Sequence, residues 1–189
     1  MDGSNYLLGL FVIITGLALA DIIVSLHGIL LNRRVVKWDW LAMFAAIFIF
    51  LLIIVSWGLS FRAWHQPGVN PTIWSFVITL GQIIPLYLAA RASLPDEVPP
   101  EGVDLAEHYA HVSRYFWSAV AVTYGLYLFA IMTTHPLNEQ LLRARWNGTV
   151  QLILMLVLIA VPQRRVHAIL VPIIMVLFVF DHLTGKLLG

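Results

Sequence analysis

The 189-residue chain contains no cysteine, which excludes disulfide bonds, thiol catalysis and thiolate metal ligands. Charge is also scarce. Charged residues make up 11% of the chain, less than half of the ~25% typical of soluble domains, whereas 60% of the residues are hydrophobic. So little polar surface cannot cover a water-soluble globule, so lipid must be the solvent. The net charge of +1 gives no indication of a nucleic-acid partner.

The amino-terminal region lacks the basic residues of a secretory signal peptide. Ala18-Leu19-Ala20 resembles a cleavage site, but no Lys or Arg precedes it and the apolar run continues to Leu31. We therefore expect residues 6–31 to be retained as a transmembrane helix.

Long apolar runs separated by polar turns occupy the rest of the chain. Because ~20 apolar residues cross a bilayer once as a helix, the pattern predicts an all-α, polytopic membrane helix bundle. We expect one transmembrane domain over residues 1–189, with six transmembrane helices at 6–31, 38–62, 72–92, 115–134, 141–161 and 166–187. The polar segment 93–114 is predicted to be a cytoplasmic acidic loop followed by an interfacial helix.

The basic residues orient these spans. One predicted side carries Arg33, Arg34, Lys37, Arg91, Arg114, Arg164 and Arg165, and the other carries Arg62, Arg143, Arg145 and Lys186. The positive-inside rule places the first set in the cytoplasm and both termini outside, as in a multi-pass protein of the cell (inner) membrane. The first and fourth spans both end in a His, a basic stretch and a Trp. This weak match leaves open a three-plus-three inverted repeat, an architecture of transporters.

Asp21 lies inside the first apolar run, where an ionisable residue is a candidate functional group. Ser25 and Gly28 follow at helical spacing, so all three share one small and polar face. No Lys or Arg is expected at the depth of Asp21. A proton, a cation or neutral donors must therefore offset its desolvation. Asp21 is predicted to be a proton or cation site, and a purely structural interhelical hydrogen bond is the alternative.

A second acid, Asp181, lies in the sixth run beside His182. Gln82 is central in the third run, where Pro85 frees a backbone carbonyl. If these helices adjoin the first, Asp21, Gln82 and Asp181 form a polar column across the bilayer. The alternative is that Asp181 and His182 lie at the outer interface.

Two further residues are possible supports for such a site. His27 lies ~9 Å along the helix from Asp21 and ~120° around it, so the two side chains do not pair directly. Tyr124 lies in the fourth run, where packing and interhelical hydrogen bonding are the alternative.

The sequence Asp104–His111 places carboxylate and imidazole groups at helical spacing. Asp104, Glu107, His108 and His111 can meet on one helix face, and these ligand types suit Zn, Fe or Mn. One helix supplies only part of a coordination shell, so a solvated helix face is the alternative.

Three functions remain open. The first is a transporter or channel for protons or a small cation, using Asp21, Ser25, Gln82 and Asp181. The second is an accessory or assembly subunit of a larger membrane complex, in which the apolar run 38–62 packs against a partner or faces lipid. The third is a metal-handling protein using residues 104–111. No catalytic motif or cofactor-binding pattern occurs, so the sequence favours a non-enzymatic protein without a cofactor. The expected partners are the lipid bilayer and a second membrane protein or another copy of the chain.

Overall fold

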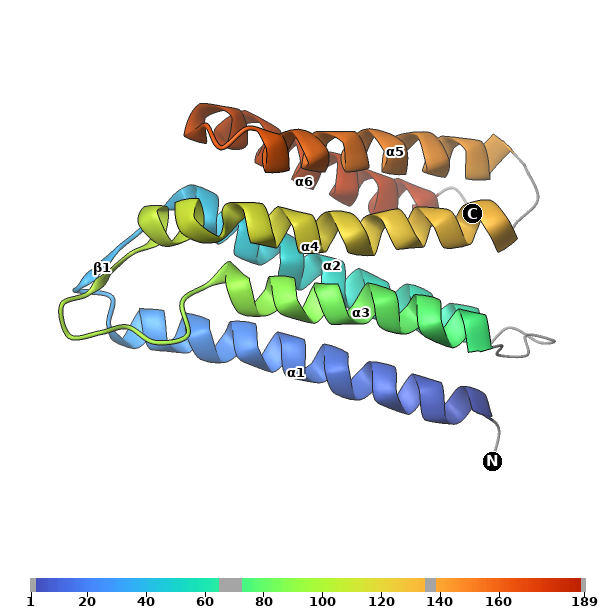
Figure 1. The fold of residues 1–189 in the computed structure, drawn as a ribbon, viewed down its shortest axis with the longest axis horizontal. Coiled ribbons are helices and arrows are strands. Elements are labelled where there is room, and N and C mark those ends of the chain that lie inside the picture. Colours follow the sequence, from blue (N-terminus) through green and yellow to red (C-terminus); the bar gives the residue numbers. More distant parts are fainter. Residues whose placement is uncertain (1–2, 65–72, 135–138, 188–189) are drawn as a thin grey trace.

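Six long helices make up most of the computed structural model, which describes residues 3–64, 73–134 and 139–187 (Figure 1). The helices lie side by side along one direction, so the prediction of an all-α helix bundle is confirmed. They are α1 (Gly3–Leu31), α2 (Trp40–Trp64), α3 (Ile73–Ser93), α4 (Leu105–Thr134), α5 (Glu139–Ala160) and α6 (Arg164–Leu187).

Four of these helices are long and apolar enough to cross a membrane, over Gly9–Leu31, Trp40–Arg62, Leu105–Met132 and Arg164–His182. Large apolar side chains also cover much of the outer surface, among them Ile13, Leu17, Val24, Ile169, Val176 and Phe180. Such a surface is stable in lipid and not in water. The fold is therefore a helix bundle whose apolar helices are compatible with a membrane protein.

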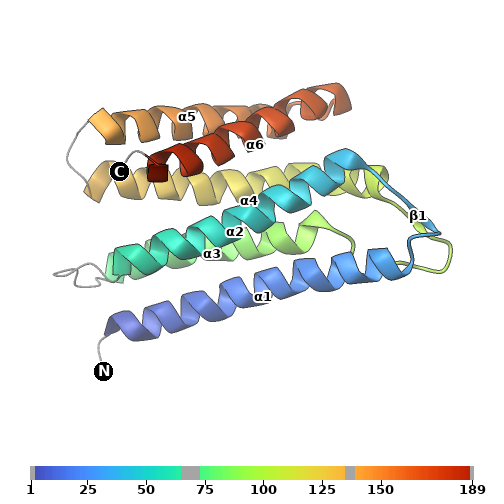
Figure 2. The same cartoon turned by 180° about the vertical axis from the view of Figure 1, so that it is seen from behind.

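Helix α2 lies in the middle of the sequence of packed helices and contacts α1, α3, α4 and α6. Phe48, Ile49 and Ile53 on this helix are almost completely buried. Helix α1 lies on one side of this centre, and α5 and α6 lie on the opposite side (Figures 1 and 2). Packing within the chain therefore accounts for the buried face of α2, while Ile47, Ile54 and Trp57 on the same helix are exposed.

The predicted interfacial helix is not separate from the fourth span. Residues 105–134 form one continuous helix, α4, about 45 Å long. Asp104 begins it, because its Oδ1 accepts the backbone N–H groups of Ala106 at 2.9 Å and Glu107 at 3.3 Å. No Gly or Pro lies between 105 and 124 to interrupt it. Similarly, α5 begins at Glu139, two residues before the predicted start of the fifth span at residue 141. Residues 135–138, which join it to α4, lie outside the described residues.

Two short strands join the loops at one end of the bundle. The strand β1 (Val36–Lys37) pairs in parallel with β2 (Val103–Asp104), and Val36 lies opposite Val103. Gly102 precedes β2 with a φ of 92°, and a Cβ atom there would collide with the carbonyl oxygen of Val35. Only glycine fits this position, where the α3–α4 loop meets the α1–α2 loop.

Candidate functional site

Asp181 and four neutral polar residues from α4, α5 and α6 form a group that we call the Asp181 cluster: Tyr124, Tyr127, Asn147, Gln151 and Asp181. Asn147 Nδ2 donates to Asp181 Oδ1 at 3.1 Å. The hydroxyl of Tyr124 donates to Gln151 Oε1 at 2.8 Å. The rings of Tyr124 and Tyr127 are 6.3 Å apart.

Helical spacing and one glycine assemble the cluster. Asn147 and Gln151 are one turn apart and therefore share a face of α5. Gly148 lies between them, where a Cβ atom would be 2.6 Å from Cδ2 of Leu128 on α4. The missing side chain lets the two helices approach closely, which brings the amides of α5 within reach of the tyrosines of α4.

Gln151 leaves part of its hydrogen-bonding capacity unused. Its side chain is fully buried, and within the described residues its Nε2 has no hydrogen-bond partner. A buried donor without an acceptor costs about 1–3 kcal/mol. The group that complements this N–H₂ is an acceptor, such as a water oxygen or a carboxylate oxygen. The cluster therefore offers a polar position inside the apolar bundle.

Asn147 is the hydrogen-bond partner of Asp181 among the side chains that the structure describes, which do not include those of residues 133–145 and 183–189. Asp181 is half-buried. A carboxyl group held by neutral donors can gain or lose a proton without breaking an ion pair.

Asp21 has a different environment. Arg91 Nη1 lies 3.6 Å from Asp21 Oδ2, and Arg91 Nη2 donates to Asp96 Oδ2 at 3.0 Å. The expectation that no basic residue lies at the depth of Asp21 is therefore wrong. Helix α3 ends at Ser93 while α1 continues beyond that level to Leu31, so Arg91 on the last turn of α3 lies beside Asp21 (Figure 1).

The Arg91 interaction does not complete the hydrogen bonding of Asp21. Oδ2 is buried and has no donor within hydrogen-bond distance among the described residues, although the side chain as a whole is 29% exposed. Ser25, one turn further along the same face, is buried as predicted from the spacing. Asp21 is thus an acid with a nearby cation at an interface between α1 and α3.

The predicted polar column does not form across the bundle. Gln82 lies on α3, which does pack against α1, and its backbone carbonyl accepts a hydrogen bond from Thr123 Oγ1 at 3.0 Å. However, α6 packs against α5 and α2, on the side of the bundle opposite α1 (Figures 1 and 2). Asp181 and Asp21 therefore belong to two separate sites.

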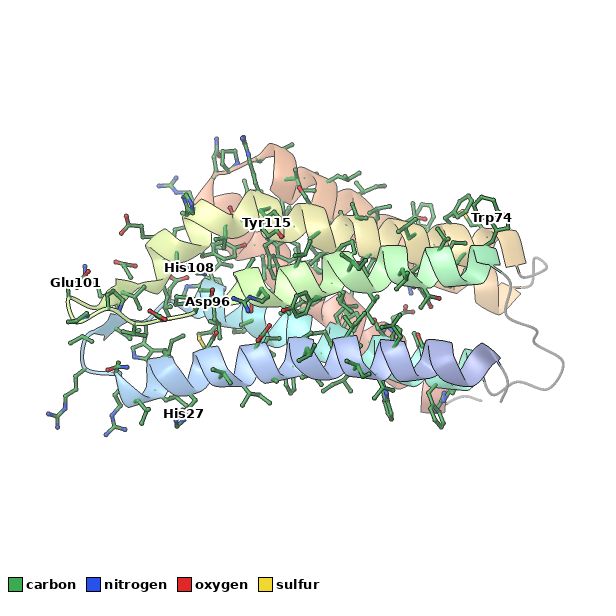
Figure 3. The ribbon with its side chains drawn as sticks, turned by 60° about the horizontal axis from the view of Figure 1, so that its bottom comes forward. His27, Trp74, Asp96, Glu101, His108 and Tyr115 are labelled. Atoms are coloured by element: carbon green, nitrogen blue, oxygen red, sulfur yellow. The ribbon has the colours of Figure 1, made fainter. Side chains whose placement is uncertain are left out.

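The histidines proposed as supports also lie apart. His27 is exposed and lies on the outer side of α1 (Figure 3). His182 Nδ1 donates to the carbonyl oxygen of Phe178 at 2.8 Å, and its ring lies 4.4 Å from that of Phe178. His182 follows Asp181 in sequence and extends the polar surface at that end of α6.

The four residues predicted as possible metal ligands between positions 104 and 111 lie in different environments. Asp104 caps α4 and lies 3.6 Å from Lys37 Nζ. The backbone N–H groups of Glu107 and Ala106, together with Lys37, hold the pKa of Asp104 below its ordinary value. His108 Nε2 donates to the carbonyl oxygen of Ala92 at 3.3 Å (Figure 3).

Glu107 and His111 are exposed. Over residues 3–64, 73–134 and 139–187, no three His, Asp or Glu side chains come close enough to hold a metal ion.

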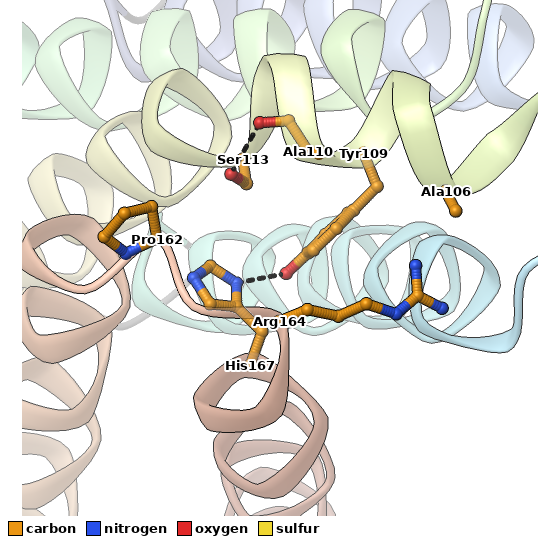
Figure 4. Close-up of a pocket in the computed structure, with 7 residues that line it drawn as sticks. All are labelled: Ala106, Tyr109, Ala110, Ser113, Pro162, Arg164 and His167. Atoms are coloured by element: carbon orange, nitrogen blue, oxygen red, sulfur yellow. Dashed lines mark hydrogen bonds between the residues drawn. The ribbon is translucent and has the colours of Figure 1, made fainter.

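One buried polar group was missed in the sequence. His167 on α6 is 2% exposed and hydrogen-bonds Tyr109 of α4 through Nδ1 at 2.8 Å (Figure 4). Trp117 Nε1 donates to the Tyr109 oxygen at 2.9 Å.

Nearby, Arg164 pairs with Asp39, which also caps α2 by accepting the N–H of Ala42.

The available signals were a histidine within an apolar run and an acid directly before the second span. A histidine within an apolar run has many interpretations. Nothing in the sequence indicates that Asp39 pairs with Arg164, which is 125 positions away.

The chemistry of both sites rests on their geometry alone, because the chain matches no protein-family model, no curated protein and no solved structure in the comparisons made with each.

Proposed function

We propose that this is a six-span membrane protein that transports or conducts protons, with Asp181 as the group that binds and releases the proton. The observation that carries the proposal is the Asp181 cluster, in which a carboxyl group inside an apolar bundle has a neutral amide as its described partner. Ionisable residues with this placement are typical of proton relays in transporters and pumps.

A proton suits the Asp181 cluster better than a metal cation. Gln151 directs an unpartnered N–H₂ donor into the cluster, and Asn147 directs its own N–H toward Asp181. Amide hydrogens repel a cation. They hold a water oxygen or a carboxylate well, and a water molecule beside Asp181 would give the proton a path.

The pairing of Asp21 with Arg91 argues against Asp21 as the transport site. A second cation at Asp21 would lie close to a guanidinium group 3.6 Å from the carboxylate. Arg91 also bonds Asp96, whose side chain is 61% exposed. We therefore assign Asp21, Ser25 and Gln82 to helix association and Asp181 to proton binding.

Two long-range pairings support six crossings. The β1–β2 ladder brings residues 36 and 103 to one end of the bundle, so α3 must return the chain that α2 carries away. The Arg164–Asp39 pair brings the α5–α6 turn to the same end, so α5 must return the chain that α4 carries away. At ~1.5 Å per residue, α3 and α5 are about 32 and 33 Å long, close to the ~30 Å of a bilayer core. The Lys/Arg distribution then favours both termini outside the cytoplasm.

Proton flux into proteoliposomes tests the proposal. We expect Asp181→Asn to lower proton flux at least tenfold, because asparagine keeps the hydrogen bond and cannot titrate. Asp21→Asn is the matched control and should retain flux, with a stability loss of at most about 1 kcal/mol for a partly exposed ion pair. Retained flux in Asp181→Asn, with both variants as stable as the wild type, would remove Asp181 as the site.

An accessory subunit is the second candidate, and α1 is the feature that favours it. This helix packs against α2 and α3 and leaves a row of large apolar side chains exposed along its outer face: Leu10, Ile13, Leu17, Val24 and Leu31. A helix of another membrane protein, or of a second copy, could cover this row. Absence of proton flux from the wild-type protein under every gradient would favour this function.

A further inference from the structure

We propose that a pocket between α4 and the α5–α6 turn binds the phosphate of an anionic phospholipid. This inference is independent of the proton site, because the pocket lies at the other end of α6 from Asp181. Seven residues line it, and its volume is about 40 Å³ (Figure 4). They are Ala106, Tyr109, Ala110, Ser113, Pro162, Arg164 and His167.

Most polar groups of the pocket wall already form hydrogen bonds within the protein. Tyr109 and His167 bond each other, and His167 Nε2 donates to the carbonyl oxygen of Val161 at 3.0 Å. Ser113 donates to the carbonyl oxygen of Ala110 at 3.3 Å. The wall is therefore rigid and supplies shape, while the capacity to bind a ligand remains with Arg164.

Arg164 is held at the pocket with donors to spare. Its Nη2 pairs with the buried carboxylate of Asp39, which fixes the side chain in place. A guanidinium group carries five N–H donors, and this side chain is 54% exposed. The remaining donors are available to a phosphate oxygen, for which arginine has matching geometry.

Two further arginines lie next to pocket-lining residues in the sequence. Arg165 follows Arg164 on α6, and Arg114 lies one turn after Ala110 on α4; both side chains are exposed. Glu107, one turn before Ala110, is the exposed acid on the same part of α4. Since Asp39 is neutralised by Arg164, the two further arginines outweigh Glu107, and the mouth is positively charged.

The pocket lies at the depth of lipid headgroups. Trp38 and Trp40 flank Asp39 in sequence and are each 48% exposed, as expected of tryptophans in the interfacial belt. Because Asp39 bonds Arg164, this belt marks the level of the pocket. Basic pockets between transmembrane helices at this level bind anionic lipid headgroups.

Size and surroundings favour a lipid over a free phosphate ion. A pocket of about 40 Å³ holds one or two water-sized groups, so phosphate oxygens enter while the ester groups remain outside. Val157 on α5 and Ile169 on α6 are exposed apolar side chains within five residues of the pocket residues Pro162 and Arg164. Acyl chains that continue from the phosphate can lie against these side chains, whereas inorganic phosphate gains nothing from them.

The test measures lipid binding to the purified full-length protein in a neutral detergent. Phosphatidylglycerol is titrated against phosphatidylcholine of the same chain length, and bound lipid is counted by native mass spectrometry. We expect saturable binding of phosphatidylglycerol at one site, with phosphatidylcholine binding at least tenfold more weakly. Inorganic phosphate at equal ionic strength should not displace the lipid. Displacement by phosphate would overturn the lipid assignment in favour of a free anion.

Two variants examine the pocket without touching Arg164. Arg114→Gln combined with Arg165→Gln should weaken binding roughly 25-fold, from about fivefold for each arginine near a membrane surface. Arg33→Gln combined with Arg34→Gln removes the same charge at the same end of the bundle and should change binding less than twofold. An equal loss in both pairs would indicate general surface attraction and overturn the site.

Ala110→Leu fills the pocket and leaves every charge unchanged. We expect it to weaken phosphatidylglycerol binding at least tenfold, with thermal stability monitored to confirm that the protein remains folded. Wild-type binding by this variant would show that the lipid does not occupy the pocket.

Discussion

Tyr109 donates its phenolic hydrogen to Nδ1 of His167 across 2.8 Å. The direction follows from the other ring nitrogen, Nε2, which lies 3.0 Å from the carbonyl oxygen of Val161 and must donate to it. The Tyr109 oxygen in turn accepts the indole N–H of Trp117 at 2.9 Å. These directions are those of a neutral His167 imidazole, and the chain of hydrogen bonds joins α4 to the start of α6.

Tyr109→Phe should destabilise the protein, because it leaves both the Trp117 N–H and the His167 Nδ1 buried without a partner. We expect the free energy of unfolding to fall by about 1–3 kcal/mol. Tyr115→Phe removes a hydroxyl from an exposed residue of the same helix and should change stability by at most about 0.5 kcal/mol. The free energies of unfolding of both variants are measured by denaturation in the same detergent. A Tyr109→Phe variant as stable as Tyr115→Phe would contradict the hydrogen bonds of Tyr109 given above.

Gly102→Ala should disrupt the junction of the two loops. The positive φ of residue 102 is strained for alanine, and the new Cβ would collide with the backbone of Val35. We therefore expect the free energy of unfolding to fall by about 1–3 kcal/mol. Gly58→Ala is the control, since no atom lies within 4 Å of a Cβ there and α2 should gain about 0.5–1 kcal/mol. Thermal unfolding midpoints should therefore move in opposite directions. A gain in both variants would mean that β1 and β2 do not pair as described.

Asp104 should make stability depend on acid pH. Folding lowers the pKa of Asp104, chiefly through the backbone N–H of Glu107, so the folded state favours the ionised carboxylate. The stabilisation by ionised Asp104 is fully present above the ordinary aspartate pKa. It is lost as the pH falls through the lowered pKa that Asp104 has in the folded state. Wild type and Asp104→Asn should therefore differ in unfolding midpoint at neutral pH and converge in acid. A difference that stays constant with pH would contradict the cap.

Single cysteines can test the topology because the chain has no native cysteine. We expect Arg33→Cys, Asp96→Cys and Arg165→Cys to react alike with an impermeant thiol reagent, since all three lie at one end of the bundle. Labelling should require broken cells if that end is cytoplasmic. Gly68→Cys, outside the described residues, should be labelled on intact cells. Different behaviour among the first three would contradict six crossings, and labelling of all three from outside would reverse the orientation.

Apolar runs predicted the helices well, because burial in lipid fixes their length. The boundaries at polar segments were harder. The sequence of α4 was divided into an interfacial helix and a span, since its first turns are polar; in the structure, buried Leu105, Tyr109 and Phe116 keep it straight against the bundle. Partners between helices were beyond prediction. Arg91 was counted among the basic residues of one membrane side, and only the early end of α3 places it beside Asp21.

The Asp181 cluster shows the same limit for a site. Asp181 and Tyr124 were singled out as polar residues in apolar runs. Asn147 and Gln151 were not, although they carry the hydrogen bonds that hold the cluster together. Uncharged amides are common at the ends of spans, and their importance here depends on the close approach of α4 and α5 at Gly148.

The pairing of Val36 with Val103 also constrains how the chain is made. These residues are 67 positions apart, and ribosomes add about 5–20 residues per second. For roughly 3–13 seconds after Val36 is synthesised, the first loop therefore has no strand to pair with. During that interval β1 is an open strand edge at the membrane surface. β2 can pair with β1 only after α2 and α3 have both been synthesised, so formation of the ladder marks the completion of the first three helices, before α4 is made.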